Sequence, residues 1–248
     1  MSQFLIQTIV DTRARPASLL ATSTFLDHAL AASVDRTVRY LNPLTYEEES
    51  CGQGHARGIT GLAVSECIQA QAPIICSSGR DGVLCLWAPR KAEVIRKMTP
   101  SCTEIKTLSV FQFGPICYII LGTKDGKVII YDCATDSIIK TFLGHRSSVL
   151  CSSVVYRGKH VEGEPLVTRH IAIATGGKDR TVRVWDFDKG KRKRKLKHPK
   201  LVMCLAVARE SLKPVLISGC SNGLLYLWDV ALGVILQTFE GHQEKIYR

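Results

Sequence analysis

The sequence has 248 residues, of which 46% are hydrophobic and 22% are charged, and its formal net charge is +11. This composition is typical of a globular chain and excludes wholesale disorder. The longest apolar runs, such as residues 116–121, are far shorter than the roughly 20 residues of a membrane-spanning helix. The N-terminal segment lacks the basic lead and the long apolar stretch of a secretory signal. We therefore expect an intracellular protein, cytoplasmic or nuclear, with no membrane insertion.

The ten cysteines are scattered singly along the chain, and no two stand at Cys-x-x-Cys spacing. This pattern argues against zinc ribbons and thioredoxin-like redox sites. Most of the cysteines lie in apolar stretches, so we expect small buried hydrophobic residues in a reducing compartment. Examples are Cys76, Cys85, Cys117 and Cys204.

One pattern recurs five times: a short apolar segment, a turn centred on Asp or Asn, and a second segment with alternating apolar residues. The turn residues are 46, 44, 54 and 43 positions apart, and a bulky residue stands six positions after each. Asp-Gly or Asn-Gly between two apolar runs is typical of a β-hairpin, and a period of two is typical of a half-buried strand. The sequence therefore predicts an all-β chain. The turn residues and their bulky partners are Asp35 and Leu41, Asp81 and Trp87, Asp125 and Tyr131, Asp179 and Trp185, and Asn222 and Trp228.

Two dipeptides accompany this pattern, Gly-His near the start of a repeat and Trp-Asp near its end. They resemble the signature of the WD40 repeat β-propellers, and the resemblance covers about residues 20–248. It implies a WD40 β-propeller with five readable four-stranded blades and the start of a sixth, in a family whose rings most often have seven. The dipeptides are Gly54-His55, Gly144-His145, Gly241-His242, Trp185-Asp186 and Trp228-Asp229, with Tyr131-Asp132 as a close variant.

Residues 1–248 are predicted to form a single propeller domain. Three alternatives stay open for the ring, because a stop inside a repeat leaves strand edges exposed. The chain is a fragment of a longer propeller, or it closes as a strained or incomplete ring with a strand from Phe4 to Val10, or a partner or second copy completes it. The expected blades cover residues 17–53, 54–100, 101–143, 144–197 and 198–240, and residues 241–248 open a further blade.

The resemblance also implies a structural, hydrogen-bonded tetrad of His, Ser or Thr, Asp and Trp in each blade. A single set could be taken for a catalytic triad, but its repetition favours a role in which buried polar groups satisfy one another. The first and third repeats keep only Asp35 and Asp125. The second and fourth repeats match every position, and the fifth is nearly complete. These sets are His55, Ser77, Asp81 and Trp87; His145, Thr175, Asp179 and Trp185; and His198, Ser218, Asn222 and Trp228.

Sequence motifs for catalysis, metal binding or phosphate binding are absent. Residues 156–170 form a polar insertion that we expect to be a surface loop, and its His160 and His170 match no metal-ligand spacing. We therefore expect a protein that is not an enzyme and that has no metal, no cofactor and no small-molecule substrate.

The positive charge is concentrated in residues 186–200, where eight basic residues and two acidic ones give a net charge of +6. This stretch falls where the fourth blade should have its outermost strand. Three interpretations stay open: an edge that resists aggregation, a contact with RNA or an acidic partner, and a nuclear-import signal. The core of this basic run is Lys191, Arg192, Lys193, Arg194 and Lys195.

A second group of basic residues stands directly before the turn residues. In the family this position lies on the top face of the propeller, where loops carry binding. Arg80, Lys124 and Lys178 are either independent solubility charges or the frame of a cationic patch for acidic or phosphorylated segments of partner proteins. We favour a non-catalytic scaffold or adaptor in a multiprotein complex. The alternative is a nuclear or nucleolar ribonucleoprotein component, such as a ribosome-assembly factor, that contacts RNA through residues 189–200.

Overall fold

The computed structural model describes residues 19–21, 29–32, 35–42, 44–45, 47–65, 73–89, 91–113, 116–157, 170–208, 215–242 and 246. Within these ranges every regular element is a β-strand, and no helix occurs. The strands form five antiparallel sheets of four strands each. The predicted all-β class and the five four-stranded blades are therefore confirmed.

Each sheet is a meander, so strands that follow one another in sequence also lie side by side. The first sheet contains β1 (Leu19–Ala21), β2 (Ala29–Ala32), β3 (Thr37–Leu41) and β4 (Glu48–Gln53). The second contains β5 (Ile59–Ser65), β6 (Ile74–Gly79), β7 (Leu84–Trp87) and β8 (Val94–Met98). The third contains β9 (Ile105–Phe113), β10 (Ile116–Thr123), β11 (Val128–Asp132) and β12 (Ser137–Phe142). The fourth contains β13 (Val149–Arg157), β14 (His170–Gly177), β15 (Thr181–Asp186) and β16 (Arg192–Lys197). The fifth contains β17 (Val202–Ala208), β18 (Val215–Cys220), β19 (Leu225–Asp229) and β20 (Val234–Phe239).

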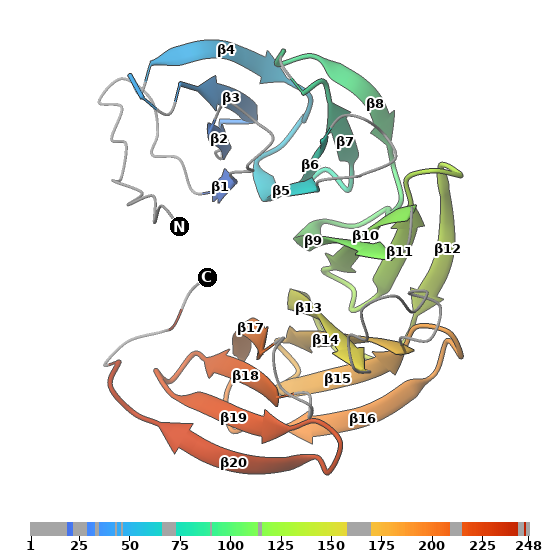
Figure 1. The fold of residues 1–248 in the computed structure, drawn as a ribbon, viewed down its shortest axis with the longest axis vertical. Coiled ribbons are helices and arrows are strands. Elements are labelled where there is room, and N and C mark those ends of the chain that lie inside the picture. Colours follow the sequence, from blue (N-terminus) through green and yellow to red (C-terminus); the bar gives the residue numbers. More distant parts are fainter. Residues whose placement is uncertain are drawn as a thin grey trace, which may run out of the picture.

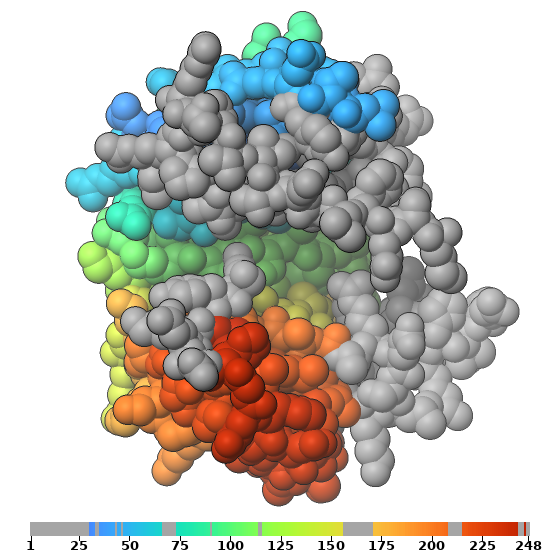
Figure 2. All heavy atoms as spheres, turned by 90° about the vertical axis from the view of Figure 1, so that its left-hand side faces the viewer, coloured from blue at the N-terminus to red at the C-terminus, as the bar shows by residue number. Residues whose placement is uncertain are grey.

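The five sheets follow one another around an arc, in the manner of propeller blades (Figure 1). The first strand of each sheet lies toward the centre and the fourth strand lies on the rim. Among the described strands, β5 packs against β1 and β9, and β13 packs against β9 and β17. Figure 2 shows the same succession from the side, with the blue, green and red sheets stacked in chain order.

The hydrophobic core is divided among the seams between successive sheets. The central strands are buried on both faces, as in β11, where all five residues are buried, whereas every residue of β20 is exposed. Each seam joins side chains of two neighbouring sheets, such as Leu30 with Ile75 between the first and second, and Ile119 with Leu84 between the second and third. Because each sheet is too thin to bury its own apolar faces, stacking against its neighbours is what stabilises it.

The turn glycines allow neighbouring sheets to pack closely at their turns. Gly82 and Gly126 have φ angles of 77° and 89°, a conformation that favours glycine. A Cβ atom on Gly82 would lie 2.4 Å from the carbonyl oxygen of Ser101, and one on Gly126 would lie 2.6 Å from that of His145. Each turn therefore abuts the loop that opens the next sheet, and this close approach excludes a side chain.

Some predicted features lie outside the described residues: the strand from Phe4 to Val10, nearly all of the insertion, and most of residues 241–248. The single domain over residues 1–248 and the three alternatives for completing the ring stay predictions.

Candidate functional site

One face of the arc carries the turns between the second and third strands of the sheets together with the loops that lead into each sheet. We call this the top face. The residue before the turn residue is held there by the same backbone hydrogen bond in four sheets. The amides of Arg80, Lys124, Lys178 and Ser221 donate to the carbonyls of Gly58, Glu104, Ser148 and Leu201 at 2.8–3.0 Å. These four positions are therefore structurally equivalent, and the first three carry exposed basic side chains.

Two of these basic residues share a hollow on the top face, between the second and third sheets. Arg80 and Lys124 line an open cavity of about 650 Å³, and Arg57 contributes a third basic side chain. Arg57 lies in the loop that leads into β5 and was not singled out from the sequence. Its position two residues after His55 could have indicated it, because His55 anchors that loop to the turn at Asp81. The remaining lining residues are Asp81, Cys102, Thr103, Glu104 and Asp125.

The acidic side chains of the hollow are bound within the molecule. Glu104 accepts hydrogen bonds from Lys106 and from Lys124 at 3.2 Å, and these two partners lower the pKa of Glu104 to about 2. Asp125 lies 2.9 Å from Lys127 and also accepts hydrogen bonds from Thr103 and Thr123. Burial raises the pKa of Asp125, but these contacts outweigh it and bring the pKa to about 2.

The cations of the hollow therefore differ in availability. Lys124 is paired with Glu104. Within the described part of the chain, Arg57 and Arg80 form no ion pair. Lys178 is exposed on the fourth sheet and does not line the hollow. The structure thus brings together two of the three predicted basic residues, adds Arg57 and leaves Lys178 apart.

The tetrad residues of the second and fourth sheets are hydrogen-bonded to one another. In the fourth sheet the indole N–H of Trp185 donates to Thr175 Oγ1 at 2.8 Å. Thr175 Oγ1 lies 2.9 Å from His145 Nε2, and His145 Nδ1 lies 2.9 Å from Asp179 Oδ2. In the second sheet the corresponding distances are 2.8, 2.8 and 3.1 Å, among Trp87, Ser77, His55 and Asp81.

The geometry assigns the proton positions in these tetrads. Burial lowers the pKa of His145, even though Asp179 opposes the shift, so the ring is neutral at pH 7. Since the carboxylate accepts a hydrogen bond from Nδ1–H, the unprotonated Nε2 atom accepts a hydrogen bond from the Thr175 hydroxyl. Both hydroxyls, on Ser77 and Thr175, are fully buried. This burial and the repeated hydrogen-bond pattern agree with the structural role that was predicted for the tetrads.

The fifth sheet has Asn222 in place of the turn aspartate, and its hydrogen bonds differ. His198 Nε2 lies 2.7 Å from Ser218 Oγ, and Trp228 donates to the same oxygen at 3.0 Å. His198 Nδ1 faces the carbonyl of Leu196 at 3.3 Å, while the Asn222 side chain accepts a bond from the Leu224 amide instead. Burial without a carboxylate partner lowers the pKa of His198 to about 4.

The basic run occupies the outer strand of the fourth sheet, as the sequence placed it. Arg192 to Lys195 lie in β16, Lys191 precedes it, and all five side chains are exposed. Two of them also bind within the molecule. Arg194 Nη2 donates to the carbonyl of Ala231 at 2.6 Å, and Lys193 Nζ lies 2.7 Å from Asp186 Oδ2.

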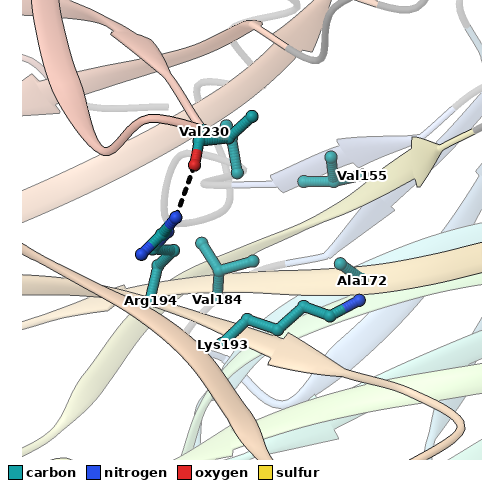
Figure 3. Close-up of a pocket in the computed structure, with 7 residues that line it drawn as sticks. Val155, Ala172, Val184, Lys193, Arg194 and Val230 are labelled. Atoms are coloured by element: carbon teal, nitrogen blue, oxygen red, sulfur yellow. Dashed lines mark hydrogen bonds between the residues drawn. The ribbon is translucent and has the colours of Figure 1, made fainter.

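Figure 3 shows how Lys193 and Arg194 lie over the seam between the fourth and fifth sheets. They line a pocket of about 280 Å³ whose other walls are apolar. Because Arg194 bridges to the fifth sheet, part of the basic run joins two blades. The remaining wall residues are Val155, Ala172, Val184, Val230 and Ala231.

Residues 136–186 match the family described as WD domain, G-beta repeat. This segment contains the complete tetrad of the fourth sheet and the strands that hold it. The chain therefore contains a WD40 repeat at residues 136–186.

Several curated relatives share limited identity with this WD40 chain. Autophagy-related protein 16 of Arabidopsis thaliana is 22% identical over 170 residues, which cover 68% of this chain and 30% of the relative. Ribosome biogenesis protein WDR12 homolog of Oryza sativa subsp. japonica is 25% identical over 150 residues, covering 53% and 33%. Mitochondrial division protein 1 of Eremothecium gossypii is 24% identical over 219 residues, covering 73% and 27%. The chain thus spans about a third or less of the length of these relatives.

The described residues also lack two further features. No helix among them is long and apolar enough to cross a membrane. No group of three His, Cys, Asp or Glu side chains in the same ranges is arranged to hold a metal ion.

Proposed function

We propose that this WD40 chain is a non-catalytic, intracellular scaffold that binds an acidic or phosphorylated segment of a partner protein on its top face. The observation that carries the proposal is the hollow where Arg57, Arg80 and Lys124 converge between two rigid sheets. Two guanidinium groups offer paired donors that match the oxygens of a carboxylate or phosphate. The acidic residues of the hollow do not oppose such a ligand fully, because each is already bound to a cation, a hydroxyl or a histidine.

Binding to a partner protein fits the family, since WD40 repeats are interaction modules. The names of the three relatives above refer to autophagy, ribosome biogenesis and mitochondrial division, so they do not point to one shared reaction. A rigid frame that displays variable side chains is compatible with such a range of processes.

Affinity purification from source cells, followed by mass spectrometry, tests the proposal. A variant with Arg57→Gln, Arg80→Gln and Lys124→Gln should lose partner recovery by about tenfold or more, because a hydrogen bond to a charged group contributes about 1.5–3 kcal/mol. The matched control, Lys91→Gln, Arg96→Gln and Lys97→Gln, removes the same charge from the outer part of the second sheet. Equal recovery with both variants would overturn the proposal.

The second candidate is an RNA contact through β16. It is favoured by three exposed basic residues, Lys191, Arg192 and Lys195, and by the relative named for ribosome biogenesis. Neutralising these three, with Lys193 and Arg194 left in place, should reduce the slope of log affinity against log salt by about 2. Recovery of partners that resists nuclease would count against this candidate, and an unchanged salt slope would reject it.

A further inference from the structure

Two cysteines lie directly opposite each other on the hairpin between β10 and β11. Tyr118 pairs with Asp132 in this ladder, so the next position outward pairs Cys117 with Cys133. The backbone N–H of Cys133 donates to the carbonyl of Cys117 at 3.1 Å. The two thiols are close enough that each shifts the pKa of the other. The sequence does not reveal this pair, because the two residues are separated by a whole hairpin.

The backbone geometry of this position permits a disulfide. Opposite residues of a hydrogen-bonded antiparallel pair have Cα atoms about 5.5 Å apart, and disulfides span Cα distances of about 4.4–6.8 Å. Cys133 is the first residue after β11, where the chain turns, so small adjustments do not disrupt the ladder.

The surroundings of the two thiols give them different exposure and opposite pKa shifts. Cys117 is 2% exposed, and interactions with the side chains of Cys133 and Ser65 lower the pKa of its thiol, although burial and Asp132 oppose the shift. Cys133 is partly exposed, and its pKa is raised by its interaction with Cys117, by burial and by nearby Cys76 and Asp132. Peroxide-sensitive cysteines react as thiolates beside a resolving thiol and need access to the oxidant, and the accessible side of this pair is that of the partly exposed Cys133.

We propose that Cys117 and Cys133 are an oxidative modification site, which a hydroperoxide such as hydrogen peroxide converts into a reversible disulfide. The Cys117 thiolate attacks one peroxide oxygen, the O–O bond breaks, and the products are Cys117 sulfenic acid and hydroxide. The Cys133 thiol then attacks the sulfenic sulfur, its proton and the departing hydroxyl form water, and the S–S bond closes. Both thiols are oxidised, and one peroxide is reduced to two molecules of water once hydroxide takes up the proton released from Cys117.

The site is separate from the top-face hollow. Cys117 is near the start of β10, and Lys124 follows the end of that strand, so the two sites lie at opposite ends of the third sheet. Cys133 packs on the seam that also contains Cys76 of the second sheet. Ser65, at the end of β5, lowers the pKa of Cys117, so the pair lies beside the second sheet and a bridge would change the environment of this seam.

Tryptic mapping of the full chain after peroxide treatment tests the proposal. Residues 107–124 contain Cys117 as their single cysteine, and residues 128–140 contain Cys133 as theirs. We expect the two peptides to be recovered as one linked species, two hydrogens lighter than their sum, and to separate again after dithiothreitol. Titration of the unfolded chain with Ellman's reagent should then show two fewer thiols out of ten.

The variant Cys133→Ala should remove the linked species, and the reversible loss of thiols should fall by about tenfold, whereas Cys102→Ala, at an exposed single cysteine, should leave both unchanged. Circular dichroism confirms that the variants are folded, and if Cys133→Ala unfolds, the peptide map of the unaltered chain decides alone. Oxidation of other cysteines without the linked species would overturn the proposal. So would a linked species that forms only after unfolding in urea.

Discussion

The third and fourth sheets reach the same turn geometry by different means. In the fourth sheet a chain of hydrogen bonds runs from Trp185 through Thr175 and His145 to Asp179. In the third sheet Leu121 occupies the place of Thr175, and Tyr131 occupies that of Trp185. Ser101 stands where His145 stands, since each carbonyl abuts the turn glycine of the preceding sheet.

Both sheets keep the turn carboxylate. Asp179 binds Thr181 at 2.8 Å, and Asp125 binds Thr123 and Thr103, so the short turn is closed in either case. What differs is the buried position behind the turn, which is a complete polar network in one sheet and apolar packing in the other. Buried polar groups stabilise a fold only when every member is paired. Replacing one member of the network by an apolar residue should therefore destabilise the sheet.

The fifth sheet is the mixed case. It retains His198, Ser218 and Trp228, but Asn222 replaces the carboxylate and does not bond to the histidine ring. The low pKa of His198, about 4, reports this missing partner.

The largest expected loss of stability comes from placing an apolar residue in the polar network of the fourth sheet. Thr175→Val keeps the shape of the side chain but leaves the Trp185 indole N–H and His145 Nε2 unpaired. Each buried unpaired group costs about 1–3 kcal/mol, so the free energy of unfolding should fall by about 4 kcal/mol in urea denaturation. The control Leu121→Val, at the equivalent apolar position, should lower it by about 1 kcal/mol. Similar losses for the two variants would contradict the interpretation that the network needs every member to be paired.

Acid should act next most strongly, through the fifth sheet. The pKa of His198 is about 4 in the folded chain and about 6.5 when unfolded, so the unfolded state binds more protons between these values. The contribution of His198 to the free energy of unfolding is therefore fully present above pH 6.5. It is lost as the pH drops toward 4, which lowers the free energy of unfolding by up to about 3 kcal/mol. Urea unfolding at pH 7 and pH 4.5 measures the loss.

A matched variant, Asn222→Asp, sharpens this result. The new carboxylate should raise the pKa of His198 toward its ordinary value and shrink the difference between the two pH values. His55 and His145, whose pKa values are also lowered, contribute equally to both proteins and cancel in the comparison. An undiminished difference would show that the missing carboxylate is not the cause.

The smallest effect is expected in the third sheet. The Tyr131 hydroxyl is buried and has no hydrogen-bond partner among the described residues. Tyr131→Phe should therefore leave the free energy of unfolding unchanged or raise it by up to about 1 kcal/mol. Tyr40→Phe in the first sheet removes a bond of 2.7 Å to the carbonyl of Ala88 and should lower it by about 1 kcal/mol. If thermal unfolding shows the same loss for both, an unseen partner holds the Tyr131 hydroxyl.

The sequence by itself determined the elements and their repetition. Turn residues such as Asp81 and Asp179 sit between alternating segments, and this local pattern is enough to predict hairpins, because strand period and turn conformation depend on neighbours in the chain. The same pattern placed the basic run on an outer strand, where β16 lies.

Only the tertiary structure decided which side chains meet. The hollow joins Arg57 and Arg80 of the second sheet to Lys124 of the third, and Glu104 neutralises part of its charge. The hairpin register sets Cys117 opposite Cys133, and the turn of the fifth sheet leaves His198 without its carboxylate. Sequence spacing does not encode these contacts, because they depend on how blades stack and on which rotamer a side chain adopts once its neighbours are packed.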